Sequence, residues 1–461
     1  MLLEKKKQKF DEITKDFLID TDGLRKIMVL LEQAFDKGLA METASSASVL
    51  MLPTYVQSIP DGTEQGEFLA LDLGGTNFRI FFVKIINREM KVKSTTCCVP
   101  NDVMKATGEE LFDYIAKCIA EFMKEHGLTK SKSLPLGFTF SFACKQDGLA
   151  SARLIAWTKG FKASGVENED VAELLRSACQ RRGDINVDVV AVLNDTTATL
   201  MASAFERNSC QIAVIVGTGT NACYMEKLEK CGKLRKGIDF EEGTFDEMCI
   251  NTEWGSFGDH GELDWLRTDF DQQVDEATIN PGHQLFLKMT SGMYLGETVR
   301  AVLERLTREG VLFGGQTEGI SKHGLFLTKY ISEIESEFIE NDGTFPKTLQ
   351  ILKVMGVEEV SQLDCIRVAT ICTLISTRAA HLIAAATATI IKRMGKPFVS
   401  IGVDGSVYRF HPTFSRLLDE KISELIDKNL KYELLLSIDG SGRGAALVAA
   451  VAMRMNKKFH C

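Results

Sequence analysis

The hydrophobic positions of the chain follow two periods, which separate a helical N-terminal segment from a segment rich in strands. Between residues 9 and 40, apolar side chains recur at mixed spacings of three and four residues, with an interruption near "IDTDG", and this pattern predicts two helices. From residue 67 onward, short β-rich runs at 68–73, 78–85 and 91–99 are joined by Gly, Asn and charged residues. These runs predict three antiparallel strands.

Helices and strands alternate along the next part of the chain. The expected pairs are helix 108–126 with strand 134–142, helix 169–182 with strand 187–195, and helix 196–206 with strand 211–221. Such alternation is typical of an α/β sheet. We interpret residues 228–247, which are rich in Gly and in charge, as an excursion from that sheet.

The second half of the chain is mostly helical before strands return near its end. The helical pattern covers 281–395 and includes a long Ala-rich stretch at 362–394. A strand with a Gly turn at 398–408 and a helix at 412–429 follow, and then "YELLLSIDGSGRGAALVAAVAM" predicts a strand, an Asp-Gly turn and a final helix.

Aspartate stands at the ends of several predicted strands, at Asp72, Asp404 and Asp439. A single Asp-Gly pair after a strand is more often only a turn. In an open α/β sheet, however, the ligand binds beyond the carboxyl ends of the strands. Glycine lets backbone N–H groups approach phosphate oxygens and a carboxylate can hold hydrated Mg²⁺, so the repeated pattern favours a metal-bound nucleotide.

The first of these turns, "DLGGTN", contains no lysine, whereas the familiar phosphate loop carries a Lys-Ser or Lys-Thr pair. We expect the metal, Arg79 and backbone dipoles to meet the charge of the phosphates instead. Thr76 and Thr218 would add hydroxyl donors.

Asp195 in "LND" ends another predicted strand, beside Asn194. A carboxylate there could take the proton of an attacking hydroxyl, as the catalytic aspartate does in phosphoryl transfer. It could equally be the N-cap of the helix predicted at 196–206. The residues alone do not decide between these readings.

Length and composition indicate a globular protein large enough to form a cleft. The 461 residues point to two or three domains or lobes, and the contents of 45% hydrophobic and 25% charged residues are ordinary globular values. A formal net charge of −9 argues against a nucleic-acid partner, which would need a basic stripe.

Neither a secretion signal nor a membrane segment is expected. The N-terminus mixes both charge signs, and the longest uncharged apolar run in the late helix, at 382–391, is about half the length that a bilayer requires. The 12 cysteines contain no C-x-x-C pair, so we interpret them as small buried side chains in a reducing compartment. We therefore expect a cytoplasmic protein.

Eight motifs together make the chain resemble the hexokinase and glucokinase family of sugar kinases. They are "LALDLGGTNFR", "GFTFSF", "WTKGF", "LNDTT", "VGTGTNACYME", "NTEWGSFGD", "GVDGSVYRFHP" and "DGSGRGAALVAA", in the order and spacing of the family. The resemblance covers the chain from residue 51 to its last helix and fits a single-unit animal hexokinase of about 50 kDa.

The resemblance implies an α/β, actin-like ATPase (ribonuclease H-like) fold with two lobes that close over a ligand cleft. The small lobe would comprise 67–195 and 441–461, and the large lobe 1–66 and 196–440. The implied activity is transfer of the γ-phosphoryl group of Mg-ATP to the 6-hydroxyl of glucose or a related hexose, the first step of glycolysis. No protein partner is indicated.

The resemblance also assigns residues to this chemistry. Asp195 would be the general base, with Lys159 and Arg79 as further catalytic groups. The hexose contacts would be Ser141, Phe142, Thr158, Lys159, Asn194, Asp195, Asn221, Glu253 and Gln284. The nucleotide contacts would be Asp72, Leu73, Gly74, Gly75, Thr76, Asn77, Thr218, Gly292, Thr328, Lys329, Tyr330, Ile331, Ser332, Ser406, Val407, Tyr408, Arg409 and Phe410, with Asp72 also serving the metal.

Three positions depart from the family pattern. Leu287 in "NPGHQLFLKM" stands where the family places a glutamate against the sugar, so one hexose contact is missing. Ala143 replaces a proline after "SF", and Thr373 replaces a glutamate in a predicted helix; we expect a small effect from the first and assign the second to packing.

Two other classes compete with a hexose kinase. A hexokinase-like sugar-sensing or regulatory protein with weak or no turnover is motivated by Leu287, although the presence of Asp195 and Lys159 argues against it. A chaperone-type ATPase with an actin-like fold would lack the "WTKG" and "LND" motifs and is remote.

Overall fold

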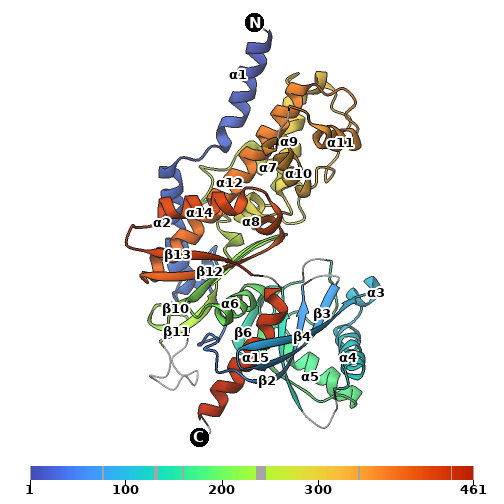
Figure 1. Ribbon diagram of the computed structural model, residues 1–461, viewed down its shortest axis with the longest axis vertical. Helices are drawn as coiled ribbons and strands as arrows, with labels where there is room; N and C mark the ends of the chain where they lie inside the picture. The colour runs from blue at the N-terminus through green and yellow to red at the C-terminus, as the bar shows by residue number, and fades with distance from the viewer. Residues whose placement is uncertain are drawn as a thin grey trace.

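Two β-sheets, with helices between and around them, organise the chain (Figure 1). The computed structural model describes residues 2–74, 77–128, 133–157, 160–234, 246–340, 343–437 and 439–459. Figure 1 shows a small lobe built on one sheet, a large lobe built on the other, and the first helix projecting away from the large lobe.

The small-lobe sheet has the strand order β4-β3-β2-β5-β8. Strands β2, β3 and β4 are antiparallel, as the sequence predicts, whereas β5 and β8 continue the sheet parallel to β2. The bounds are β2 Gly66–Leu73, β3 Asn77–Ile86, β4 Glu89–Cys98, β5 Leu134–Phe140 and β8 Val187–Leu193.

The large-lobe sheet repeats this arrangement. Its order is β1-β11-β10-β9-β12-β13, in which β9, β10 and β11 are antiparallel and β12 and β13 run parallel to β9. The bounds are β1 Leu52–Pro53, β9 Cys210–Val216, β10 Thr220–Lys227, β11 Glu247–Asn251, β12 Phe398–Asp404 and β13 Lys431–Leu436. Both sheets contain three antiparallel strands that two parallel strands continue, and β1 adds one more antiparallel strand in the large lobe; this repeated arrangement agrees with the predicted actin-like ATPase fold.

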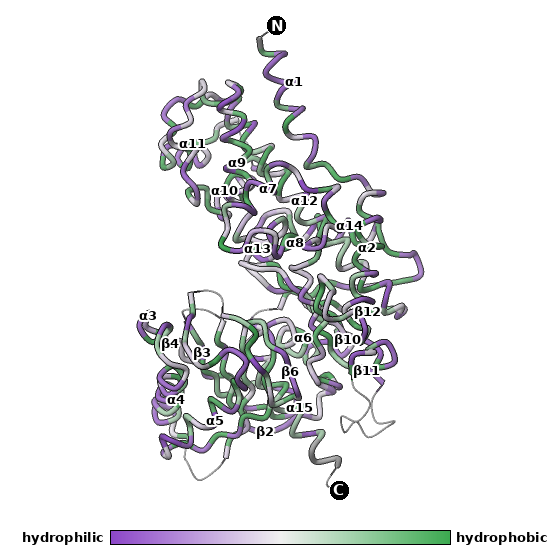
Figure 2. The backbone as a smooth tube through the Cα atoms, turned by 180° about the vertical axis from the view of Figure 1, so that it is seen from behind, coloured by the Kyte–Doolittle hydropathy of each residue, from purple (hydrophilic) through white to green (hydrophobic). Residues whose placement is uncertain are grey.

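Alternate side chains of the small-lobe strands face two different helical layers. Leu69 and Leu71 of β2 belong to the core formed with α4 (Gly108–Glu125) and α5 (Val171–Arg182), whereas Ala70 belongs to a second core. That second core contains α6 (Asp195–Glu206), α15 (Gly440–Phe459) and side chains of both sheets. Helices α6 and α15 therefore lie between the two lobes, as Figure 2 shows from behind.

The contact between α6 and α15 requires glycine. A Cβ atom at Gly444 of α15 would overlap the carbonyl oxygen of Ala198 in α6. The two helix backbones can touch at this point only because the side chain is absent.

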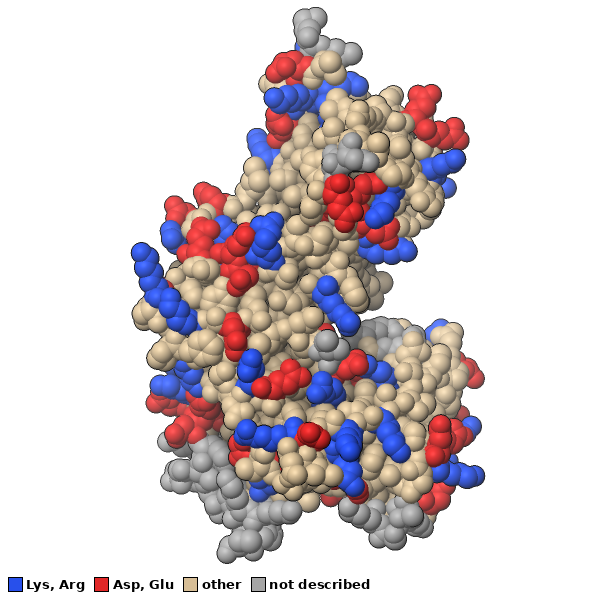
Figure 3. Space-filling view, viewed as in Figure 1, with Lys and Arg blue, Asp and Glu red and all other residues tan. Residues whose placement is uncertain are grey.

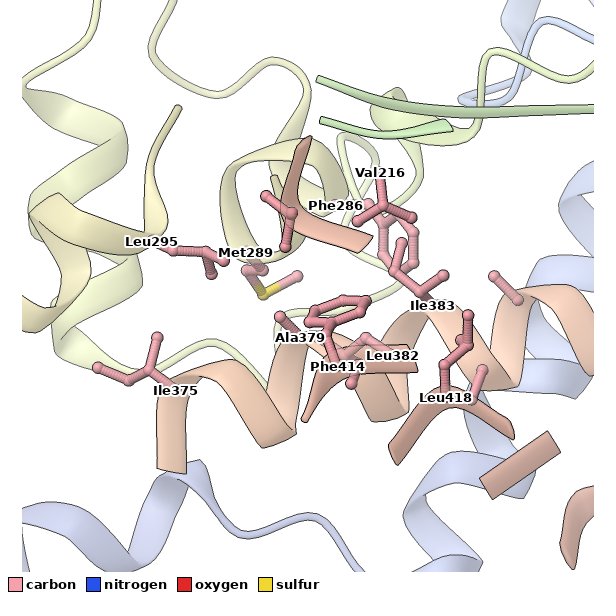
Figure 4. Close-up of a cluster of buried hydrophobic side chains, with 14 of the residues drawn as sticks. Val216, Phe286, Met289, Leu295, Ile375, Ala379, Leu382, Ile383, Phe414 and Leu418 are labelled. Carbon is pink, nitrogen blue, oxygen red and sulfur yellow. The ribbon is translucent and has the colours of Figure 1, made fainter. Parts of the chain in front are cut away.

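The large-lobe core surrounds the 33-residue helix α12 (Gln362–Met394). Figure 4 shows its Ala379 and Ile383 beside Phe414 of α14 (Phe414–Leu425) and Phe286 of α8 (Leu285–Thr290). In the described residues α12 is long and apolar enough to cross a membrane, but 72% of its apolar window is buried by the protein itself. This burial is that of a helix in a protein core.

The remaining helices complete the two lobes. Their bounds are α1 Leu2–Thr14, α2 Thr21–Leu39, α3 Asn101–Met104, α7 Asp269–Glu276, α9 Leu295–Arg308, α10 Thr328–Ile339, α11 Pro346–Val354 and α13 Ser406–Phe410. Both predicted N-terminal helices are present, and the Asp20 side chain in "IDTDG" caps α2 by accepting the Gly23 N–H at 2.7 Å.

The elements predicted at 211–221 and 398–408 differ in part from the structure. The strand expected at 211–221 is a hairpin, because the backbone turns at 217–219 between β9 and β10. Within 398–408 the predicted strand ends at Asp404, before the predicted Gly turn, and 406–410 form the short helix α13, which was not predicted. A small hairpin of β6 (Cys144–Gly148) and β7 (Ser151–Leu154) was not predicted.

The described cysteines behave as expected. Most are buried and none of them is in a disulfide. Burial raises the pKa of Cys210 to about 12 and that of Cys365 to about 11, so both thiols stay protonated at neutral pH. The residue bounds of the two lobes remain a prediction.

Candidate active site

The carboxyl ends of the parallel small-lobe strands meet at the cleft. Leu73 of β2 lies opposite Phe140 of β5, and the Ser141 N–H donates to the Leu73 carbonyl at 3.1 Å. A Cβ atom at Gly74 would stand 3.5 Å from the Ser141 hydroxyl, so the turn after β2 lies directly against Ser141. The face in Figure 3 is hollowed between the two lobes.

Asn194 and Asp195 follow the neighbouring strand β8 and open helix α6. The N-cap is Asn194, whose Oδ1 accepts the Thr196 N–H at 2.9 Å and the Thr196 hydroxyl at 2.8 Å. The alternative role considered for Asp195, that of N-cap, is therefore wrong. Asp195 occupies the first helical position, where the helix dipole favours a negative charge.

An aromatic cluster supports the segment that precedes Thr158. Phe142 packs edge-on against Trp157, with ring centroids 4.9 Å apart, and Trp157 stacks on Phe161 at 5.3 Å. Trp157 therefore packs between the rings of Phe142 and Phe161. The predicted site residues Thr158, Lys159, Gly75 and Thr76 lie outside the described residues.

Across the cleft, the large lobe contributes a buried polar cluster. The amide nitrogen of Asn221 donates to Asn251 Oδ1 at 2.8 Å and to Glu253 Oε1 at 3.1 Å. The Asn251 amide also donates to Glu253 Oε1, at 2.8 Å.

Glu253 and Gln284 hold unusual backbone conformations in this region. Their φ angles are 53° and 59°, in the left-handed region that disfavours side chains with a Cβ atom. Asp259 stabilises Gln284, because its carboxylate accepts the N–H groups of Gln284 and Leu285, both at 2.9 Å. Such strain typically persists at functional sites.

Leu287 lies over the backbone of this polar cluster. Its Cδ1 is 3.6 Å from the place where a Cβ of Gly219 would stand and 3.3 Å from that of Gly255. Gly219 is two residues from Asn221, and Gly255 is two residues from Glu253. The half-buried Leu287 thus places an apolar side chain beside the predicted hexose contacts.

A pocket of about 430 Å³ in the large lobe collects many of the predicted nucleotide contacts. It is within the size range of small-ligand sites. The predicted residues that line it are Thr218, Gly292, Thr328, Lys329, Ser332, Ser406, Val407 and Phe410, joined by Met293, Glu333, Ser336, Lys347 and His411.

The other predicted large-lobe nucleotide residues do not line this pocket. Ile331 and Tyr408 are buried in the large-lobe core, while Tyr330 contacts the ring of Phe326 and Arg409 lies over that of Phe410. Two hydrogen bonds to backbone carbonyls hold the wall of the pocket. The Gly292 N–H donates to the Gly217 carbonyl at 2.8 Å, and the Thr328 hydroxyl donates to the Gly292 carbonyl at 2.5 Å.

Arg79 on β3 is the centre of a charged network at the small-lobe edge. Its Nη2 donates to Asp72 Oδ2 at 2.8 Å and to the Ser441 hydroxyl at 3.0 Å, and its Nη1 donates to Asp439 Oδ1 at 2.8 Å. Ser441 in turn donates to Asp72 Oδ2 at 2.7 Å. The strand-end aspartates of the two sheets therefore converge, as the sequence predicts.

Asp404 completes this convergence from the end of β12. Burial raises the pKa of Asp404 and the charge of Asp439 adds to the rise, while the N–H groups of Gly405 and Gly440 and the charge of Arg79 oppose it. Carboxylate oxygens are the ligands that Mg²⁺ prefers, and Mg²⁺ needs few of them because it keeps several waters. The donor set therefore fits a metal brought in by the nucleotide, although the described residues contain no group of three ligands that would hold an ion alone.

Several residues of the site were missed by the sequence reasoning. Asn251 is the first residue of the recognised motif "NTEWG", so the sequence did offer its amide as a candidate. Asp259, Met293 and Ser441 act through contacts with residues distant in sequence, which the local pattern does not reveal.

Comparisons with known proteins identify the family. Models described as hexokinase match residues 211–451 and 9–205. Hexokinase-2 of Homo sapiens is 45% identical over 458 residues, which are 97% of this chain and 48% of that protein. Hexokinase-1 of Mus musculus is 45% identical over 463 residues, 98% of this chain and 46% of that protein. The chain spans about half the length of the curated relatives it matches.

Solved structures agree with this result. A hexokinase from Schistosoma mansoni, complexed with glucose, has a TM-score of 0.88 at 40% identity and covers 97% of this chain and 99% of its own. Another hexokinase crystal structure has a TM-score of 0.84 at 27% identity, with 97% and 100% covered. The chain belongs to the hexokinase family.

Proposed function

We propose that the protein transfers the γ-phosphoryl group of Mg-ATP to the 6-hydroxyl of glucose or a related hexose, the entry reaction of glycolysis, in the cytoplasm. The carrying observation is that Asn194, which precedes Asp195 at the end of β8, lines the same pocket as Asn251, which belongs to the polar cluster with Asn221 and Glu253. Ring hydroxyls need such convergent donors and acceptors. The hexokinase family and the glucose complex of the Schistosoma mansoni relative support the same assignment.

In this proposal Asp195 takes the proton of the attacking hydroxyl. The side-chain oxygen Oδ1 of Asn194 accepts both hydrogen bonds from Thr196, so the side-chain N–H groups of Asn194 would orient the sugar. A correctly placed base typically contributes about 10²–10⁴-fold in rate.

The nucleotide would lie between the large-lobe pocket and the turn after β2. Backbone N–H groups at Gly74 and Thr218, together with Arg79, would bind its phosphates, and Asp72 would hold the hydrated Mg²⁺ that travels with it. The metal would supply neutralisation of phosphate charge.

A sugar-sensing protein with weak turnover is the second candidate. The observation in its favour is Leu287, which replaces a polar hexose contact with an apolar one beside Gly219 and Gly255. Such a protein would bind hexose or nucleotide but form little product.

A coupled ADP-release assay with Mg-ATP separates the two candidates. The purified protein would be titrated with glucose, mannose and fructose up to high concentration, and the sugar phosphate identified by phosphorus NMR. Saturable, hexose-dependent ADP formation with a 6-phosphate product supports the kinase. Binding of hexose without ADP formation for any sugar contradicts it and supports sensing.

A further inference from the structure

The ion pair between Arg79 and Asp439 connects the small lobe to the segment that joins the two lobes. Arg79 belongs to β3 of the small-lobe sheet. Asp439 lies between β13 of the large lobe and α15, and Ser441 follows it in the first turn of α15. The two partners are 360 positions apart in the sequence, so the pair fixes the crossing segment directly against β3.

The two carboxylates on Arg79 are held with different strength. The side chain of Asp72 is 10% exposed and shares its Oδ2 with Ser441, whereas the side chain of Asp439 is 60% exposed. Ion pairs that face water contribute little, because solvent and salt screen them. Asp439 is therefore the partner of Arg79 that a competing anion displaces first.

Asp439 also carries backbone strain. Its φ angle is 54°, in the left-handed region, and this conformation directs the carboxylate toward Arg79. Loss of the ion pair removes one of the contacts that hold the residue in this conformation.

A nucleotide phosphate is a stronger ligand for Arg79 than the exposed carboxylate. Phosphate carries more negative charge and offers several oxygens to the planar guanidinium, which binds such groups in bidentate fashion. Asp72 and Asp439 both pair with Arg79, so a phosphate reaches the guanidinium only in competition with these carboxylates.

We propose that Asp439 is a positioning residue that occupies Arg79 until nucleotide phosphates displace it, so that nucleotide binding releases the segment between the lobes. The proposal rests on the proposed nucleotide site. The proposal predicts that the negative charge of Asp439 lowers the affinity of the protein for nucleotide.

The test is calorimetric titration of the full chain with Mg²⁺ and a non-hydrolysable ATP analogue. The Asp439→Asn variant keeps a residue type that tolerates a positive φ but removes the charge. We expect it to bind the analogue more tightly, by up to about fivefold, the contribution of an exposed ion pair. Asp439→Gly, which also allows the left-handed conformation, should behave likewise, and Asp439→Glu should remain close to the natural protein.

Two further variants define the interpretation. Asp427→Asn removes another exposed aspartate of the large lobe, paired with Lys392 at 3.7 Å, and should leave the affinity unchanged. Ser441→Ala removes the hydroxyl that joins Arg79 to Asp72 and should weaken binding instead. A residue with a merely structural role would weaken binding when altered, so tighter binding is the diagnostic result.

The proposal is overturned if the Asp439→Asn variant has the same unfolding temperature as the natural protein but binds the analogue equally or more weakly. That result would leave the nucleotide site intact. A natural protein that does not bind the analogue at all would instead overturn the nucleotide site and with it the proposed function.

Discussion

Replacing Leu287 by glutamate should strengthen hexose binding without changing the catalytic base. The half-buried side chain lies over Gly219 and Gly255, which are two residues from Asn221 and from Glu253, respectively. A hydrogen bond to a charged acceptor contributes about 1.5–3 kcal/mol. At about 1.4 kcal/mol per decade, this is roughly one to two orders of magnitude in affinity. The carboxylate of Glu253 belongs to the same cluster and repels a second negative charge, so we expect the lower figure.

The assay is the half-saturating hexose concentration at saturating Mg-ATP, measured by coupled ADP release. Leu287→Glu should lower it about tenfold with kcat nearly unchanged, Leu287→Gln should lower it by about two- to tenfold because its hydrogen bonds are neutral, and Leu287→Met should have no effect. A folded Leu287→Glu protein with an unchanged or raised half-saturation point would refute a position of Leu287 against the sugar.

Two other substitutions test the supports of the site. Gly292→Ala would place a Cβ atom 2.8 Å from both the Gly217 carbonyl oxygen and Val407 Cγ2, which distorts the wall of the pocket. The half-saturating Mg-ATP concentration should therefore rise by at least about fivefold, while the half-saturating hexose concentration stays constant. Gly148→Ala, where the Cβ would meet open space, is the control, and an equal effect on both substrates would contradict the assignment of the pocket. Lys288→Met removes a buried ammonium that donates to Asp275 at 2.6 Å. Urea unfolding should show that the free energy of unfolding falls by about 3 kcal/mol. This is the low end for a broken buried pair, because Arg267 still contacts Asp275 at 3.1 Å. The exposed Lys392→Met should lose far less; equal losses would show that the buried pair does not anchor α8.

The sequence pattern predicted most of the fold because the period of the apolar residues is local information. The strand "FLALDL" alternates between two helical layers in the structure, with Leu69 on one face and Ala70 on the other. The error at 211–221 has a local cause as well. The run "QIAVIVGTGTN" contains no polar break before its glycines, so a hairpin and a strand followed by a turn look alike.

The candidate site was predictable where a motif carried it and not where distant segments meet. Asn221 and Glu253 were assigned from motifs, and the structure brings them into one cluster. The pair of Arg79 and Asp439 was not foreseen, because the sequence shows each residue but not the partner 360 positions away. The Asn194 cap was missed since both Asn and Asp are good N-caps, and only the geometry of α6 shows which one acts.

The most direct test of the central claim is the comparison of Asp195→Ala with the natural protein in two measurements, kcat for hexose-dependent ADP formation and hexose affinity by calorimetry. If Asp195 is the general base of a hexose kinase, kcat falls by about 10²–10⁴-fold, and the variant remains folded and still binds hexose. A variant that retains the natural kcat would contradict the assigned base and the mechanism built on it.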